Sequence, residues 1–185
     1  MRDIAHARKL AAHHLAEPLP RRWNHVQGVG AWAEQVAAAI GDQEDVLATA
    51  GWLHDIGYAP DIADTGFHPL DGARFLRRAG IDERVVCLVA HHTCAQLEAE
   101  ERGLGDVLAV EFPRERSEIA DALLYCDMTT SPDGFPVAVP DRLTEIRSRY
   151  GPGAIVTRFI NRAAPEILAT ARRTEERMAK SYALV

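Results

Sequence analysis

Apolar residues recur every three or four positions along most of this chain, which is the spacing of an amphipathic helix rather than of a strand. The clearest run covers residues 23–40, where Val26, Val29, Ala33 and Val36 fall on one face. The same spacing predicts further helices over residues 4–15, 43–56, 68–79, 83–91, 115–128, 142–150 and 154–179. An all-α fold is therefore the natural expectation.

Glycine and proline mark where these helices begin and end. Gly41 and Gly80 follow two of the apolar runs, and Pro69 lies in the first turn of another, which are the positions these residues favour. Pro165 lies inside the last run, where it is expected to kink or divide the helix. These signals predict short, separate helices that pack on one another.

Two stretches are less regular. Residues 95–111 predict a short acidic helix followed by a glycine-rich connection, and residues 136–139 are the only strand-like run. No repeat, linker or low-complexity region separates one part of the chain from another. The pattern predicts a single domain over residues 1–185. For the acidic segment and the last helix, three roles are compatible with the sequence: a lid, a homodimer interface or ordinary surface.

Composition narrows the class of protein. The chain has 185 residues, a formal net charge of −6 and 47% hydrophobic residues, which suits a globular domain and argues against a nucleic-acid polymer as partner. No apolar stretch has the length of a membrane span or of a signal-peptide core, so no membrane partner is expected. The three cysteines, an odd number without a C-x-x-C pair, predict reduced packing residues in a cytoplasmic protein.

Several histidines and aspartates lie on the apolar faces of these predicted helices. The residues three, four and seven positions before His54, His92 and Asp127 are mostly apolar, and His25 shares a helix face with Val29, Trp32 and Val36. These four side chains are therefore expected to point inward. A single histidine of this kind is usually a hydrogen-bonded core residue, but several on separate helices need partners. Imidazole and carboxylate together suit a transition metal such as Fe, Mn, Co, Ni or Zn.

The stretch "GWLHDIGYAP" places His54 and Asp55 side by side. Neighbouring residues on a helix diverge by about 100°, so both can bind a metal only where several helices converge. Helical bundles build metal sites in their cores in this way.

The order His25, His54-Asp55, Asp127 resembles the H…HD…D signature of the HD-domain superfamily of metal-dependent phosphohydrolases. The sequence stretches around these residues, "RWNHVQGVGAWA", "AGWLHDIG" and "ADALLYCDM", resemble the motifs of that family. The resemblance covers about residues 20–130 and implies a single-domain helical bundle with a metal site in its core. Helices over residues 141–181 are then expected to pack on that core.

Two further sequence stretches, "FHPLDGARFL" and "VAHHT", resemble the additional histidine motifs of two-metal HD proteins such as the YqeK type. The resemblance implies that His25, His54, Asp55 and Asp127 hold one metal ion. It also implies that Asp55 bridges to a second ion held by His68 and by His92 or His91, with His92 the better match. The alternatives are that His68 is a helix cap and that His91 is not a ligand. The acidic extension of (p)ppGpp hydrolases and the G-Y-P element of cyclic-di-GMP hydrolases are absent.

The expected activity is hydrolysis of a phosphoester or phosphoanhydride in a small, nucleotide-like substrate, with one or two divalent ions as cofactor and Mg as a further option. Asp55 is expected to orient the nucleophile, and His91 to act as a general acid if it is not a ligand. The string R-x-x-H resembles one in the YqeK type, and this resemblance implies that Arg22 binds phosphate; a surface arginine is an equal alternative. Two other functions stay open: a di-iron oxygenase built on the same ligands, and a regulatory module that binds a nucleotide or metal without turnover.

Overall fold

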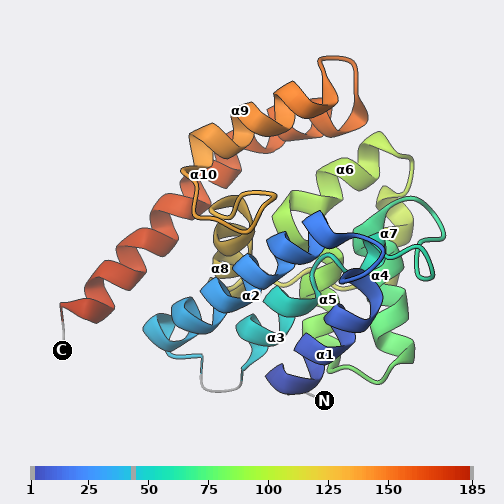
Figure 1. Ribbon diagram of the computed structural model, residues 1–185. Coiled ribbons are helices and arrows are strands. Elements are labelled where there is room, and N and C mark those ends of the chain that lie inside the picture. The colour runs from blue at the N-terminus through green and yellow to red at the C-terminus, as the bar shows by residue number, and fades with distance from the viewer. Residues whose placement is uncertain (1–2, 43–44, 184–185) are drawn as a thin grey trace.

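The computed structural model describes residues 3–42 and 45–183, and the described residues form helices joined by short connections (Figure 1). The α-helices of the first half are α1 (Ile4–Leu15), α2 (Pro20–Ile40), α3 (Val46–Leu53), α4 (His68–Arg78) and α5 (Glu83–His91). Those of the second half are α6 (Ala95–Glu101), α7 (Gly105–Glu111), α8 (Glu118–Met128), α9 (Val139–Tyr150) and α10 (Ile155–Tyr182). Two short 3-10 helices complete the set, η1 (Ile56–Tyr58) and η2 (His92–Cys94). The all-α prediction is confirmed.

The expected helix over residues 43–56 is shorter in the structure. Residues 43–44 lie outside the described part of the chain, and α3 begins at Val46, where the side chain of Asp42 accepts a hydrogen bond from the Leu47 amide at 2.7 Å. The α-helix ends at Leu53 rather than Ile56, and a 3-10 turn follows. His54 and Asp55 therefore lie at the end of a helix, where the chain changes direction.

The strand-like run over residues 136–139 forms no strand in the described residues. Pro136 makes one isolated antiparallel bridge with Thr130, and Val139 already begins α9. Proline lacks a backbone N–H and suits the first turn of a helix, so Pro140 at that position favours α9 over a continued strand. The apolar residues in this run pack as part of a turn and a helix start.

Pro165 was expected to kink or divide the last helix, and a division is wrong, because α10 is continuous from Ile155 to Tyr182 with the proline inside it. A proline removes one hydrogen bond within a helix, and packing on neighbouring helices can offset that loss. Here α10 packs against α8, α9 and α6 along its length.

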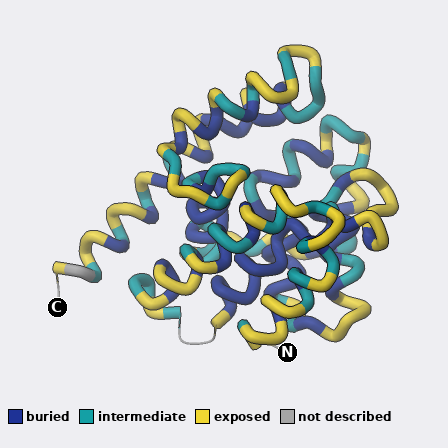
Figure 2. Tube along the Cα trace, viewed as in Figure 1, coloured by how far each residue is buried: buried dark blue, intermediate teal, exposed yellow. Residues whose placement is uncertain are grey.

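The core lies around α3, whose eight residues are all buried between α1, α2, α5 and α8 (Figure 2). Its close packing on α2 depends on Gly30, where an added Cβ would lie 2.4 Å from the Trp52 ring. Gly30 lies in the stretch "GVGAWA", and its lack of a side chain lets α2 and α3 pack this closely. The three cysteines are buried and free, and no described helix has the length and apolar character to cross a bilayer.

Candidate metal centre

Six predicted ligands come from five different helices and the turns that follow them. They are His25 on α2, His54 and Asp55 after α3, His68 at the start of α4, His92 after α5, and Asp127 on α8. All are buried except His68, whose side chain is 13% exposed. Because α3 is the central helix, its C-terminal end brings the His-Asp pair to the place where the other elements meet.

The six side chains form two groups of three. His25, His54 and Asp127 make one group, and Asp55, His68 and His92 make the other. Within each group every residue offers one ligand atom, and these atoms lie within 4.8 Å of one another. Groups of this size and composition are compatible with a divalent metal ion.

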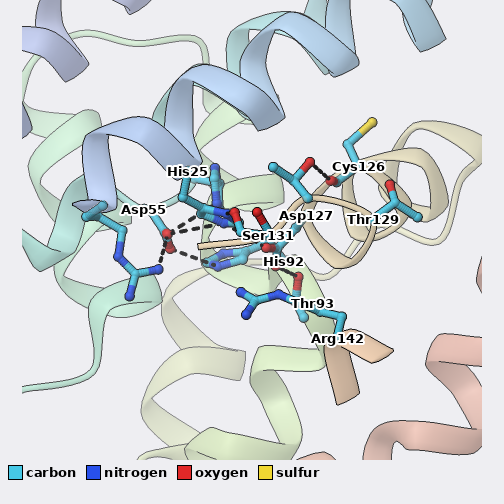
Figure 3. Close-up of polar contacts among 12 residues, drawn as sticks. His25, Asp55, His92, Thr93, Cys126, Asp127, Thr129, Ser131 and Arg142 are labelled. Carbon is cyan, nitrogen blue, oxygen red and sulfur yellow. Dashed lines mark hydrogen bonds and ion pairs between the residues drawn. The ribbon is translucent and has the colours of Figure 1, made fainter. Parts of the chain in front are cut away.

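Asp55 faces both groups, and Figure 3 shows its carboxylate near His25 of one group and His92 of the other. Its Oδ2 atom is 3.3 Å from Nε2 of His54 and 3.8 Å from Nε2 of His25. Its Oδ1 atom is 3.3 Å from Nε2 of His68 and 3.8 Å from Nε2 of His92. One carboxylate thus directs one oxygen to each group, which is the arrangement of a bridging ligand.

Backbone carbonyls hold the imidazoles in the orientation that metal ligation needs. The Nδ1 atoms of His25, His54 and His92 donate to the carbonyls of Ser131, Gly51 and Val89, at 3.0, 2.8 and 2.6 Å. A carbonyl only accepts, so Nδ1 carries the proton in each ring and the lone pair stays on Nε2. All three Nε2 atoms face the centre.

The Nε2 atom of His54 supplies a test of whether a metal fits here. His54 is fully buried, yet this nitrogen makes no hydrogen bond in the described part of the chain. A buried polar atom without a partner is costly, and a metal ion would satisfy it. The residues present therefore fit a metal ion.

The electrostatics of the centre agree with that fit. Burial would raise the pKa of Asp55, but the charges of Arg22 and His54 outweigh it and hold that pKa well below its ordinary value. Burial opposes ionisation of Asp127 as well, but the neighbouring imidazoles of His25 and His54 outweigh it and lower the pKa of that carboxyl. Both carboxylates are therefore ionised at neutral pH, as metal ligation requires.

The two histidines of the second group are held neutral. Burial lowers the pKa of His68 well below its ordinary value and also lowers the pKa of His92. Their Nε2 atoms lie 3.2 Å apart, which disfavours two imidazolium charges. His54 differs, because Asp55 and Asp127 outweigh its burial and raise its pKa.

Gly57 makes the approach of His68 to Asp55 possible. A Cβ at Gly57 would lie 2.0 Å from the carbonyl oxygen of His68 and 2.6 Å from the backbone nitrogen of Gly72. Gly57 follows the expected end of the helix over residues 43–56 and by its position in the sequence indicates only a helix stop. Its additional role is to let η1 lie against the first turn of α4.

Arg22, which the sequence suggested as a phosphate-binding residue, lies beside Asp55. Its NH1 donates to Asp55 Oδ2 at 2.7 Å, and its guanidinium lies 4.0 Å from the centre of the Tyr58 ring. Tyr58 in turn stacks on His68 at 3.9 Å between ring centres. The side chain is only 21% exposed, so the alternative of a surface arginine does not describe it.

His91 does not join the centre. Its Nε2 lies 2.7 Å from the carbonyl of Phe112, and it belongs to neither group of candidate ligands. His91 is the last residue of α5, and the backbone turns at His92, so the two neighbouring rings diverge. The expectation of His91 as a ligand or general acid therefore has no support in its position.

Several supporting residues were missed from sequence. Thr93 donates from Oγ1 to Oδ2 of Asp127, and the final T of "VAHHT" was its only signal. Asp71, 2% exposed, accepts hydrogen bonds from the backbone of Asp64 and Thr65 and so fixes the loop before His68. A lone Asp on a helix gives no sign of a partner six residues earlier.

A cavity of about 80 Å³ opens beside the two groups. Arg22, Asp55, His68, His92 and Asp127 line it on one side. The other side is lined by residues of α9 and α10, beyond the predicted core of residues 20–130.

The family model of the HD domain matches residues 22–128, which is more than half of the chain. The chain belongs to the HD domain family. HD domains are in general metal-dependent hydrolases, and the His–Asp groups of this HD domain are compatible with that chemistry. The match ends at the last residue of α8, so α9 and α10 lie outside it.

Curated relatives of this HD domain match it over short stretches. A tRNA (cytidine(56)-2'-O)-methyltransferase of Thermoplasma volcanium is 37% identical over 78 residues, 42% of this chain and 22% of that protein. Ribonuclease Y of Opitutus terrae is 33% identical over 99 residues, 51% of this chain and 19% of that protein. Ribonuclease Y of Chloroflexus aurantiacus is 34% identical over 93 residues, 48% and 18% of the two chains. The chain thus spans about a fifth of the length of these relatives, and no solved structure matches it.

Proposed function

We propose that this HD domain hydrolyses a phosphoester or phosphoanhydride of a small, nucleotide-like molecule with the help of two divalent metal ions. The observation that carries the proposal is the position of Asp55, whose two carboxylate oxygens face two separate groups of ligand atoms. The proposed ligands of one ion are His25, His54, Asp55 and Asp127, and those of the other are Asp55, His68 and His92.

The donor set favours particular metals. Four imidazoles and two carboxylates suit Fe, Mn, Co, Ni or Zn, whereas Mg prefers oxygen ligands and is the weaker candidate. When bound, such ions lower the pKa of a coordinated water and polarise phosphoryl oxygens.

The chain's own residues bind and orient the substrate. Asp55 holds the nucleophilic water between the two groups, and Arg22 binds a phosphate oxygen. Arg22 pairs with Asp55 in this structure, so an incoming phosphate competes with that carboxylate for the same guanidinium. Tyr58 supports the guanidinium through its ring face.

RNA hydrolysis is a second candidate because two relatives carry the name Ribonuclease Y. The net charge of −6 disfavours binding of a nucleic-acid polymer, since such binding depends on neutralising phosphates with basic side chains. A small substrate therefore stands first, and a single-stranded RNA oligonucleotide belongs in the substrate panel.

The test begins with metal analysis of protein purified without chelators. The protein is then loaded with Mn, Co, Ni, Fe, Zn or Mg and assayed for phosphate release from nucleotides, dinucleoside polyphosphates and the RNA oligonucleotide. We expect turnover of a small nucleotide that is abolished in Asp55→Ala and retained in His6→Ala, a matched control on the exposed face of α1. Retained activity of metal-loaded Asp55→Ala would falsify the mechanism.

The same preparation separates the other two functions. Oxygen consumption together with an iron EPR signal, without phosphate release, would identify a di-iron oxygenase. A nucleotide bound tightly without turnover in any of these metals would identify a regulatory module.

A further inference from the structure

The cavity beside the candidate metal centre is lined on one side by α9, which lies outside the HD family match. Arg142 on α9 lines this cavity together with Asp55, His92 and Asp127. Figure 3 shows its guanidinium directed towards Thr93 and the His–Asp cluster. An element beyond the family's matched region thus places a cation at the site.

Arg142 has an unmet hydrogen-bonding capacity. The residue is only 5% exposed, and its Nε atom is buried without a hydrogen-bond partner in the described part of the chain. Arginine is seldom buried unless its donors are paired, because desolvation of the charge is costly. An anion in the cavity would supply the missing acceptor.

The carboxylate beside Arg142 does not neutralise this part of the site. Glu145 accepts from NH1 of Arg142 and also accepts two hydrogen bonds from Arg149. One carboxylate therefore serves two guanidinium groups, and Arg149 lines the same cavity. The α9 wall carries a net positive charge opposite the two metal-ligand groups.

The cavity is small. Its volume is about 80 Å³, whereas ligand pockets for drug-sized molecules measure about 300–1,000 Å³. A single water needs roughly 10–15 Å³ of such volume, so the cavity admits a group of a few water molecules' size. A phosphoryl group fits this description, and a whole nucleotide does not.

The rest of a substrate has a place just outside. Arg22, Tyr58 and Arg149 line both this inner cavity and an outer pocket of about 340 Å³. The outer pocket is also lined by Pro18, Leu19, Pro20 and Pro132, which offer apolar contact. A terminal phosphate can enter the inner cavity while its organic part stays in the outer pocket.

We infer that Arg142 is a phosphate-binding residue that selects terminal phosphates, so that the substrates of this site are phosphomonoesters rather than phosphodiesters. The inference rests on the proposed function and names its substrate class. Water forms a bond to phosphorus, the P–O bond to the organic group breaks, and the protons of the water end on the alcohol and on inorganic phosphate. An internal diester carries a second substituent that the inner cavity has no room for.

The first test measures phosphate binding directly. Inorganic phosphate is titrated into the metal-loaded protein by calorimetry, for the wild type, Arg142→Met, Arg142→Lys and the control Arg147→Met. Arg147 lies on the same helix but hydrogen-bonds Asn161 at 2.8 Å and does not line the cavity. We expect Arg142→Met to weaken phosphate binding about 10- to 100-fold, Arg142→Lys to fall between, and Arg147→Met to match the wild type.

The second test compares p-nitrophenyl phosphate with bis(p-nitrophenyl) phosphate. We expect the wild type to prefer the monoester, and Arg142→Met to lose about 10- to 100-fold in kcat/KM for it. Metal-free Arg142→Met should unfold at the same or a higher temperature than the metal-free wild type, because the variant removes a buried donor without a partner, and Glu145 keeps its two hydrogen bonds from Arg149. That result separates phosphate binding from a structural role.

The outcomes separate the two proposals. Unchanged phosphate binding in a folded Arg142→Met, or a wild-type preference for the diester, overturns the inference while leaving phosphohydrolysis intact. Failure of the wild type to hydrolyse any phosphoester overturns the proposed function, whereas phosphate binding that depends on Arg142 would still support this subsite. A third outcome is that Arg142→Met loses folding stability while Arg142→Lys binds phosphate as tightly as the wild type. Phosphate binding would then need only a positive charge at this position, and selection of terminal phosphates by the arginine would be refuted.

Discussion

Asp55 and His54 are neighbours in the chain but serve different groups of ligand atoms. His54 belongs with His25 and Asp127, whereas Asp55 belongs with His68 and His92 and also faces His54. This division arises because the helix ends at Leu53, so the two side chains leave the backbone at a turn. One dipeptide thereby contributes to both halves of the centre.

Separate loss of the two metal ions is the expected consequence of this division. We expect His68→Ala to retain about one of two bound ions, since the group around His54 stays complete, and His54→Ala to lose the other ion. Metal content per chain after gel filtration measures this, with His6→Ala as the exposed control. Loss of all metal in His68→Ala, or of none, would contradict two separate sites.

Thr93 shows how the surroundings of a ligand are held in place. Its hydroxyl donates to Asp127, and its backbone is left-handed, with a φ of 46°, which is rare for a β-branched residue. Cys94 next to it is also left-handed, with a φ of 61°. The break between α5 and α6 therefore stores strain beside the centre, where it directs His92 inward and Thr93 towards Asp127.

At the scale of elements, close contact between η1 and α4 brings the two metal-ligand groups together. Gly57 and Gly72 meet at this contact, and no side chain at Gly57 fits without displacing the first turn of α4. Asp71 fixes the same turn from its other side through the loop at Thr65. His68 thus has its position determined by backbone packing.

Gly57→Ala is expected to disturb this packing and the His68 side of the centre. The added Cβ would lie 2.0 Å from the carbonyl oxygen of His68, so α4 must shift, at a cost of about 1–3 kcal/mol in the free energy of unfolding. We also expect weaker binding of the second metal ion. Thermal unfolding and metal content measure the two effects, and Gly153→Ala is the control because nothing lies within 4 Å of a Cβ there. Wild-type stability and metal content in Gly57→Ala would show that the contact is not needed.

At the scale of the whole molecule, the buried histidines couple folding to pH in the metal-free protein. The pKa values of His68 and His92 are lowered by burial, from an unfolded value of about 6.5. Their stabilising contribution is complete above that value and is lost as pH falls towards their folded pKa values. His54 acts in the opposite direction, because its pKa is raised and its contribution is lost as pH rises.

Burial lowers the pKa of His91 as well, so three histidines with lowered pKa values stand against His54 and give the expected sign. We expect the free energy of unfolding of the chelator-treated protein to decrease as pH is lowered from 7.5 to 5, measured by urea denaturation. The double variant His68→Gln, His92→Gln should show a weaker dependence on pH over the same range. A metal-free wild type that gains stability in acid would contradict the balance described.

The sequence by itself determined the helical class and the HD family motifs, because helix periodicity and the spacing of inward His and Asp residues are local properties of the chain. The end of α2 at Gly41 was predictable for the same reason, because it depends on a glycine next in the chain. The tertiary structure decided everything that depends on segments far apart in sequence: the sharing of Asp55 between two groups, the turning away of His91, and the approach of Arg142 from α9. These contacts depend on where helices end and on how closely backbones approach, and neither is encoded in the spacing of apolar residues. Tertiary packing also explains why α10 is continuous, because its contacts with α6, α8 and α9 outweigh the local effect of Pro165.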